Sequence, residues 1–363
     1  MKLQVTQENL AKALNTVARV AHSRSSLPIL SNVLLKTTDN RLSIAATNLD
    51  IAITHTIGSK IAKNGSITVP ARLMQDFVSS LPDSVLDLEL TDNKLHITTE
   101  QYQSTINGVS AEDFPIMPAI TKGSTWQVAA ADFKKALSQV VFAASADDAR
   151  PVLTGVYFHS TNSGIAMAAT DSYRLAEHIL PKAKNAVNFL VPASAAADLL
   201  RIISDTEEEV SVTHDNQQVL FQVGEVTMVA RLIDGQYPDY RKLIPAKFST
   251  VAKLSKADFL NIAKVSSLFA RESAGSITIK VDRASKSVSI NAVASQLGEN
   301  TATADAEVSG SGEVTLNSRY LIDGLNAFSG QTIEFCFNGK LEPCILRSSD
   351  DEHYLHLVMP LRS

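Results

Sequence analysis

The first strong pattern in the chain is an apolar stripe near its beginning. Apolar residues recur there at steps of three and four, which places them on one face of an α-helix. The residues of this stripe are Leu10, Ala13, Leu14, Val17 and Ala21. Thr6 and Asn9, just ahead of it, are typical of a helix N-terminal cap. The sequence therefore predicts an amphipathic helix at the start of the chain.

The same pattern returns twice at a spacing near 123 residues. The helical segment VTQENLAKALNTVARVA at 5–21 is followed by related segments at 128–144 and 254–270. A second amphipathic segment also occurs three times, at 69–82, 191–204 and 316–329. Pro70 and Pro192 suit the first turn of this second helix, where a missing N–H costs nothing. This internal repetition predicts three tandem units, each with two helices.

Alternating strand patterns and turn signals fill the space between the helices, and they repeat with the same spacing. The turn dipeptides are Asp92-Asn93, Asp215-Asn216 and Asn338-Gly339. Prolines 115, 238 and 360 mark the unit ends. We therefore expect an α+β chain of three tandem domains, each with two helices packed on antiparallel sheet. The expected domains are 1–122, 123–246 and 247–363.

The chain finishes with the apolar segment LHLVMPLRS. Terminal residues are usually polar and poorly ordered. In the repeat alignment, Leu355 to Val358 is the closing strand of the third unit, and a strand packed against helices is apolar. Met359, Pro360 and Leu361 lie beyond that strand and need a second explanation.

Composition is that of a folded protein, with 45% hydrophobic and 20% charged residues over 363 positions. The N-terminal segment lacks the basic and apolar regions of a signal peptide, and no apolar run is long enough to span a bilayer. We expect a cytoplasmic protein without membrane contact. A two-residue hairpin at Asn338-Gly339 would pair Cys336 with Leu341 and leave Cys344 out of register, so no disulfide is expected.

Positive charge is concentrated on the predicted helices, although the net charge is −5. Acidic clusters, such as residues 207–209, fall in loops instead. Ordinary solvated helix surface would explain any single Lys or Arg, but their joint placement indicates a local positive surface. No base-reading motif is present, so contact with nucleic acid would be to phosphates and independent of sequence. The helix residues are Lys12, Arg19, Arg24, Lys135, Lys264, Arg72, Arg201 and Arg319.

Catalytic and metal-binding motifs are weak. The chain has no P-loop, no GxGxxG opening a helix, no GxSxG and no HExxH. His353 and His356 lie beside acidic residues, but the segment reads as a charged turn that enters a strand. Asp171, Tyr173 and Arg174 form the most enzyme-like stretch, yet no partner motif accompanies them. We expect no catalytic residue, no metal and no cofactor.

Six motifs occur in a fixed order along the three repeats. They are LPILSNVLLKT (27–37), TVPARLMQDFVSSLP (68–82), EDFP (112–115), ATDSYRLA (169–176), LIDGQYPDYRKLIP (232–245) and VMPLR (358–362). Together they resemble the bacterial DNA sliding clamps, the β subunits of DNA polymerase III, over the whole chain. The resemblance implies a non-catalytic processivity factor, a head-to-tail homodimer that closes a ring of six similar domains around duplex DNA.

Partners and site residues follow from the same resemblance. Arg24 and Arg72 match DNA-contacting positions of the family, whereas Ala193 and Ser194 stand where some members have Lys. A cleft between the second and third domains would bind short peptide motifs of the replicative polymerase alpha subunit, the clamp-loader delta subunit, translesion polymerases and repair proteins. The matching cleft positions are Leu153, Thr170, Ser172, Tyr173, Arg174, Leu175, Pro238, Lys242, Leu243, Pro343, Leu357, Met359, Pro360, Leu361 and Arg362.

Within this cleft, Met359 and the leucines would form an adaptable apolar floor, and Arg174 with Arg362 would meet polar groups of a peptide. Tyr173, Lys242 and Ser273 depart from common family residues, so peptide preference is expected to differ. The implied dimer interface residues are Leu73, Ile106, Ser267 and Leu268. Two other functions fit parts of the sequence: a repeat scaffold that binds peptides without encircling DNA, and an enzyme that uses the Asp171 stretch.

Overall fold

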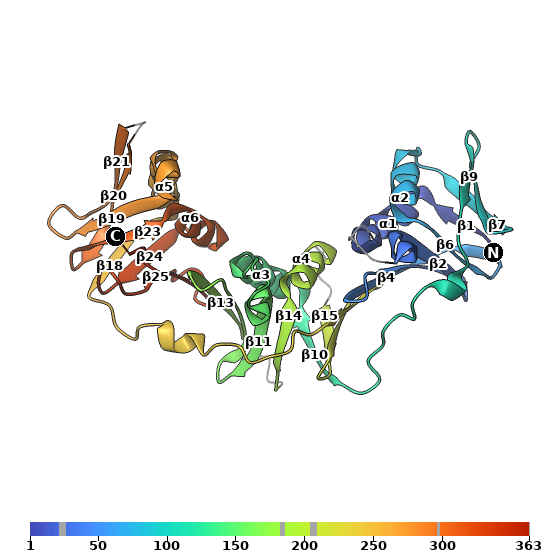
Figure 1. Ribbon diagram of the computed structural model, residues 1–363, viewed down its shortest axis with the longest axis horizontal. Helices are drawn as coiled ribbons and strands as arrows, with labels where there is room; N and C mark the ends of the chain where they lie inside the picture. Colours follow the sequence, from blue (N-terminus) through green and yellow to red (C-terminus); the bar gives the residue numbers. More distant parts are fainter. Residues whose placement is uncertain (22–26, 182–185, 204–208, 296–297, 363) are drawn as a thin grey trace. The chain divides into compact units, whose positions relative to one another are not determined.

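The computed structural model describes residues 1–21, 27–181, 186–203, 209–295 and 298–362. The predicted helix pairs are present in all three repeats (Figure 1). The six α-helices in the described residues are α1 (Gln7–Ala21), α2 (Ala71–Ser80), α3 (Ala130–Val140), α4 (Ala193–Ile202), α5 (Lys256–Phe269) and α6 (Ser318–Ala327). None of these helices is long and apolar enough to cross a membrane.

The apolar stripe predicted for the first helix is buried. Leu10, Leu14 and Val17 are fully covered on the inner face of α1, and the hydroxyl of Thr6 accepts from the backbone N–H of Asn9 at 3.4 Å. Pro70 and Pro192 end strands and directly precede α2 and α4, so the prediction that they lie in the first helical turn was wrong by one position. There each proline fixes the chain at the strand-to-helix junction.

The chain divides into two compact units, and the second repeat contributes to both. Unit 1 comprises Met1–Ala131 and Arg201–Leu232, and unit 2 comprises Asp132–Leu200 and Ile233–Ser363. The domain boundaries predicted from the repeats stay a proposal. Two sheets lie in each unit, and in each unit the larger sheet is built from two neighbouring repeats.

Unit 1 contains a five-stranded sheet in the order β5-β1-β7-β8-β9 and an eight-stranded sheet in the order β10-β15-β16-β17-β4-β3-β2-β6. Helices α1 and α2 pack together, and α1 lies on β3 and β4. The strands are β1 (Lys2–Thr6), β2 (Asn32–Thr38), β3 (Arg41–Thr47), β4 (Ile51–Gly58), β5 (Lys60–Lys63), β6 (Ser66–Pro70), β7 (Val85–Thr91), β8 (Lys94–Thr98), β9 (Gln103–Asn107), β10 (Ser124–Ala129), β15 (Glu209–His214), β16 (Gln218–Val223) and β17 (Val226–Arg231).

Unit 2 contains a nine-stranded sheet in the order β14-β11-β12-β13-β26-β25-β24-β18-β22 and a four-stranded sheet in the order β21-β20-β19-β23. Helices α5 and α6 pack together, and α5 lies on β20 and β21. The strands are β11 (Gly155–Thr161), β12 (Gly164–Thr170), β13 (Arg174–Pro181), β14 (Asn188–Pro192), β18 (Thr250–Ser255), β19 (Ser276–Asp282), β20 (Ser287–Ala294), β21 (Gly298–Asp305), β22 (Glu307–Ser309), β23 (Gly312–Asn317), β24 (Thr332–Phe337), β25 (Cys344–Arg347) and β26 (Tyr354–Val358).

These pairings confirm the α+β prediction of three repeats on antiparallel sheet, and they explain the apolar end of the chain. Strand β26 is the predicted closing strand, and it lies inside the larger sheet of unit 2, between β25 and β13. Strand β17 of the second repeat pairs with β4 of the first in the same way. The last strand of a repeat therefore completes the sheet of the preceding repeat.

The turn predictions differ in their outcome. Asp92 and Asn93 form a two-residue hairpin between β7 and β8, with φ values of 48° and 58° that match a type I′ turn. The hairpin predicted at Asn338-Gly339 was wrong, because Cys336 pairs with Ile345 across a longer connection. Both cysteines are buried and free.

Candidate functional site

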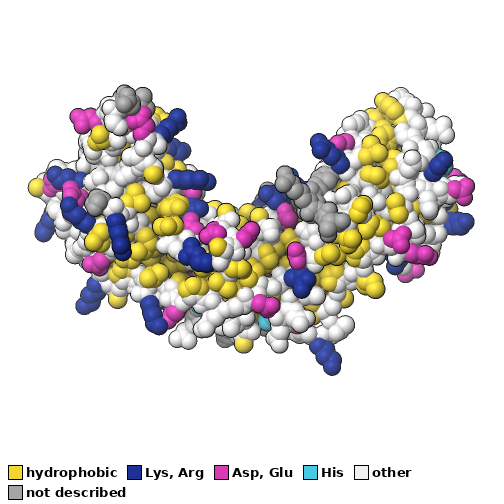
Figure 2. All heavy atoms as spheres, viewed as in Figure 1, with side chains coloured by type: hydrophobic (Ala, Val, Ile, Leu, Met, Phe, Trp, Pro, Cys, Tyr) yellow, Lys and Arg dark blue, Asp and Glu magenta, His cyan; other side chains and the backbone are white. Residues whose placement is uncertain are grey.

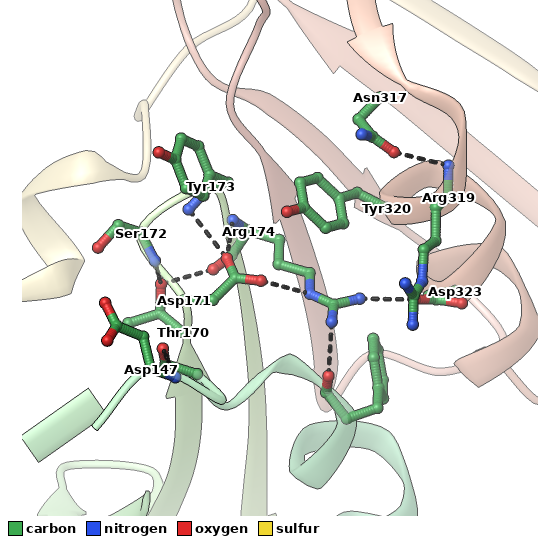
Figure 3. Close-up of polar contacts among 12 residues, drawn as sticks. Asp147, Thr170, Asp171, Ser172, Tyr173, Arg174, Asn317, Arg319, Tyr320 and Asp323 are labelled. Carbon is green, nitrogen blue, oxygen red and sulfur yellow. Dashed lines mark hydrogen bonds and ion pairs between the residues drawn. The ribbon is translucent and has the colours of Figure 1, made fainter. Parts of the chain in front are cut away.

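The loop that follows β12 is fixed by its own side chains. Asp171 accepts at Oδ1 from the backbone N–H groups of Tyr173 and Arg174, at 2.9 and 3.0 Å. The hydroxyl of Thr170 accepts from the N–H of Ser172 at 3.1 Å, and Ser172 has a φ of 78°. Short polar side chains favour such turns because they bind the backbone locally. The loop therefore presents the 59% exposed Tyr173 on a rigid base (Figure 3).

Arg174 is buried, and its guanidinium is fully engaged (Figure 3). Nε donates to Asp171 at 3.0 Å, Nη1 donates to Asp323 of α6 at 2.6 Å, and Nη2 donates to the carbonyl of Phe142 at 2.8 Å. The guanidinium carbon lies 4.8 Å from the ring centroid of Tyr320 and 5.4 Å from that of Phe142. Arg174 therefore joins the second repeat to the third. The predicted role as a contact for a peptide's polar groups does not fit this geometry.

The apolar floor predicted for the cleft is a buried cluster. Leu153, Leu175 and Leu357 are at most 4% exposed and pack with Tyr237 and Tyr240. They come from the η4 turn (Pro151–Thr154), β13 and β26, with the two tyrosines from the connection between the second and third repeats. The structure thus brings together four segments that are far apart in the sequence.

The tail beyond β26 is held by backbone hydrogen bonds to the Tyr173 loop and to β23. The N–H of Met359 donates to the carbonyl of Tyr173 at 2.8 Å, and the N–H of Leu361 donates to the carbonyl of Thr315 at 2.8 Å. Met359 is only partly buried and packs against the cluster. The tail therefore lies along the Tyr173 loop with part of its apolar surface accessible.

The predicted cleft residues fall into a covered floor and an accessible rim. Tyr173 and Leu243 are 59% and 49% exposed. Lys242 is exposed and pairs with Asp239 at 2.8 Å. In Figure 2, hydrophobic side chains gather on unit 2 over the region where Figure 1 draws α6, β25 and β13. Of the remaining predicted positions, the exposed ones are Ser172, Pro238 and Arg362, and the half-buried ones are Thr170, Pro343, Met359, Pro360 and Leu361.

The sequence did not predict the residues that hold the connection between the second and third repeats against the nine-stranded sheet of unit 2. The hydroxyl of Tyr240 donates to the carboxylate of Glu177, which also accepts from Arg241 Nη2 at 3.1 Å. His159 Nε2 lies 2.7 Å from the Tyr240 hydroxyl. Burial, followed by the neighbouring Glu177, raises the pKa of Tyr240. The only signal in the sequence was the PDYRK motif, which does not show that Glu177 is its partner.

Lys135 was predicted to contact a phosphate, but in the structure it pairs with Asp351. Its ammonium lies 2.7 Å from the carboxylate of Asp351, a side chain that is only 1% exposed. The same carboxylate also accepts hydrogen bonds from Gln139 and Ser329. Burial alone would raise the pKa of Asp351, but hydrogen bonds from Lys135, Ser329 and Gln139 outweigh it and lower the pKa. Lys135 therefore neutralises a buried charge, and it is a poor candidate for a phosphate contact.

The other predicted phosphate contacts in the described residues lie on helix surfaces. Arg72 and Arg319 are 83% and 81% exposed, with loose pairs to Asp76 at 3.7 Å and Asp323 at 3.9 Å. Figure 2 shows Lys and Arg side chains projecting over the region of α5 and α6. The remaining exposed candidates are Lys12, Arg19, Arg201 and Lys264. Arg24 lies outside the described residues.

The predicted dimer residues are unequal in exposure. Leu73 on α2 and Leu268 on α5 are 53% and 51% exposed. Ser267 is half-buried, and Ile106 is 5% exposed on β9, so its side chain is already covered within unit 1. Strands β9 and β21 are the outer strands of their sheets, each paired on one side. The dimer interface at these leucines stays a prediction.

His356, Asp171 and Arg174 make contacts within the fold. His356 is buried, with Nε2 3.2 Å from the carbonyl of Tyr320, and burial lowers its pKa to about 3. Among the described residues, no three side chains of metal-binding type lie together. Asp171 and Arg174 form the ion pair of the Tyr173 loop described above.

Comparison with known proteins identifies the fold and its family. Models of the DNA polymerase III beta subunit match the N-terminal domain at residues 1–118, the central domain at 127–239 and the C-terminal domain at 241–362. The beta sliding clamp of Synechococcus elongatus is 31% identical over 100% of this chain and 99% of its own. That of Staphylococcus epidermidis is 27% identical over 100% of both chains.

Solved structures agree. The Bacillus subtilis DNA polymerase sliding clamp superposes with a TM-score of 0.95 at 27% identity, covering 100% of this chain and 99% of that one. A Bartonella birtlesii DnaN sliding clamp, solved bound to griselimycin, has a TM-score of 0.94 at 26% identity and full coverage of both chains. The three repeats, the C-terminal strand that completes the preceding sheet and these matches establish that the chain belongs to the DNA polymerase III beta subunit family, the non-catalytic sliding clamps of bacterial DNA replication.

Proposed function

We propose that two copies of this chain form a head-to-tail ring that encircles duplex DNA and recruits partners through the cleft of unit 2. The observation that carries the recruiting role is the tail from Met359 to Leu361, which lies along the Tyr173 loop and leaves an accessible apolar rim over a buried floor. An apolar rim on a rigid base is suited to a short peptide with large apolar side chains.

The partners proposed for the cleft are the replicative polymerase alpha subunit, the clamp-loader delta subunit, translesion polymerases and repair proteins. The accessible side chains are Tyr173, Leu243, Met359, Pro360 and Leu361. Arg174 and the floor leucines would act by positioning them. The relative from Bartonella birtlesii was solved with bound griselimycin, which supports ligand binding by proteins of this fold.

The DNA contact proposed here is weak and independent of sequence. Arg72 and Arg319 extend from helices and form only loose pairs with their own carboxylates, so they are available to phosphates. A ring that holds DNA by topology needs no base contact, which agrees with the absence of base-reading motifs from the sequence. We place this activity in the cytoplasm, and we assign the three domains to 1–122, 123–246 and 247–363.

Ring closure is the step that an experiment must test. The purified chain is loaded on closed circular DNA by a bacterial clamp loader, and retention is measured by gel filtration before and after linearisation. We expect retention on the circle and loss from the linear form, because a topological link ends when DNA has free ends. A scaffold that binds peptides without encircling DNA predicts no difference between the two forms, and that result would refute the ring.

A further inference from the structure

The first repeat carries a copy of the Tyr173 loop with apolar residues at its rim. The hydroxyl of Thr47 accepts from the N–H of Leu49 at 3.0 Å, as Thr170 does from Ser172. Asn48 Oδ1 accepts from the N–H groups of Asp50 and Ile51 at 3.1 and 2.8 Å, as Asp171 does in the second repeat. Leu49 has a φ of 77°, against 78° for Ser172. The two loops therefore share one backbone geometry.

The surroundings of the loop are copied as well. The N–H of Leu30 donates to the carbonyl of Leu27 at 3.1 Å, as that of Leu153 donates to Arg150 at 2.9 Å. The N–H of Arg231 donates to the carbonyl of Asp50 at 2.9 Å, as that of Met359 donates to Tyr173. Unit 1 therefore has the same backbone hydrogen-bonding arrangement, here called the frame, as the unit 2 cleft, with β17 in the place of β26.

What differs is the chemistry of the rim. In unit 2, Arg150 Nη1 donates to the hydroxyl of Ser172 at 2.8 Å, so a polar pair closes that part of the frame. The equivalent positions in unit 1 hold Leu27 and Leu49, which are 46% and 50% exposed. An exposed leucine is ordinary by itself. A leucine held in the left-handed region at an exposed rim is costly, because both strain and solvation oppose it.

We propose that Leu27, Leu49 and Arg231, here named the Leu49 patch, bind a short extended peptide segment that carries leucine-like side chains and a carboxylate. Arg231 is exposed at the place of Met359, and among the described residues none of the ion pairs includes it. Arg231 is bound through its backbone to Asp50, the residue after Leu49, and an exposed arginine on this strand next to an apolar loop complements an acidic and apolar segment. This inference is independent of the function proposed for the unit 2 cleft.

The size of the patch favours a peptide over a second copy of the chain. A stable protein–protein interface buries roughly 800 Å² on each partner. Two half-exposed leucines and one arginine offer far less than that, but they suffice for a few side chains of an extended segment.

The test uses the full-length chain with ¹³C-labelled leucine methyl groups. The probes are a capped peptide in which two leucines alternate with aspartates, and the same peptide with lysines in place of aspartates. Leu27→Met and Leu49→Met each remove the methyl signals of one leucine, which assigns the signals of Leu27 and Leu49. We expect both signals to shift with the acidic peptide and to shift much less with the basic one.

The matched variant restores the polar pair of the second repeat. Leu27→Arg with Leu49→Ser should fold normally, because Arg150 and Ser172 occupy the same frame in unit 2. Because this variant lacks both reporter leucines, its affinity is measured by fluorescence polarisation of the labelled acidic peptide, and loss of the two apolar side chains should weaken binding by about tenfold relative to the unchanged chain. Arg231→Glu should reverse the preference between the two probes. Leu341→Ser, an exposed leucine in unit 2, is the surface control and should have no effect.

A chain that ends at Val358 separates this patch from the unit 2 cleft. Retention of the acidic-peptide shifts in that chain supports the Leu49 patch. Three results would overturn the proposal: loss of the shifts in the shortened chain, no shift at millimolar peptide, or methyl shifts that follow protein concentration without peptide, which would indicate a second copy as the occupant.

Discussion

At the scale of single residues, one carboxylate has two arginine partners, a buried one and an exposed one. Asp323 accepts from the buried Arg174 at 2.6 Å and pairs with the exposed Arg319 at 3.9 Å. Both arginines carry the same charge, but only Arg174 has lost its water and depends on its protein partners. Burial therefore decides which of the two stabilises the fold.

Substitution of these two arginines should separate the roles. Arg174→Ala leaves Asp171 and Asp323 without their main partner, and we expect unit 2 to lose about 3–5 kcal/mol of unfolding free energy. Arg319→Ala should cost less than about 1 kcal/mol, because an exposed pair contributes little. Urea denaturation, with hydrogen exchange of the α6 amides as a local probe, measures both. Equal losses in the two variants would contradict the structural role of Arg174.

At the scale of elements, prediction succeeded where the signal is local. The stripe from Leu10 to Ala21 and the Asp92-Asn93 turn follow from a few neighbouring residues, and both elements formed as expected. The partners of Arg174 and Lys135 are Asp323 and Asp351, which belong to another repeat, so no local pattern reveals them. For the same reason the apolar residues of β26 predicted a buried strand but not its pairing with β13.

The tail after β26 is an element whose removal tests the cleft. A chain that ends at Val358 loses the bonds from Met359 to Tyr173 and from Leu361 to Thr315, together with part of the apolar rim. We expect it to lose stimulation of the replicative polymerase while the dimer remains. A chain that ends at Leu361 keeps both backbone bonds and is the matched control. Primer extension and sedimentation measure the two properties, and undiminished stimulation by the shorter chain would remove the cleft assignment.

At the scale of the whole molecule, buried histidines make the free energy of unfolding depend on pH. His55 in unit 1 and His178 and His356 in unit 2 are at most 7% exposed. Burial lowers the pKa of His55 and His178 to about 4 and that of His356 to about 3. In the unfolded chain each histidine titrates near ~6.5. Between these values the unfolded state binds more protons, so the free energy of unfolding falls as the pH falls.

We therefore expect full stability from these groups above pH ~6.5, and a loss of up to about 1.4 kcal/mol per pH unit for each histidine below it. Asp351 and the other carboxylates with lowered pKa act at lower pH, so the window from ~6.5 to ~4.5 isolates the histidines. His178→Gln keeps a hydrogen-bonding group beside Gln139 and should flatten the pH dependence of urea denaturation for unit 2. A slope that His178→Gln does not alter would place the acid sensitivity in other groups, because removal of a titrating site must remove its share of proton uptake.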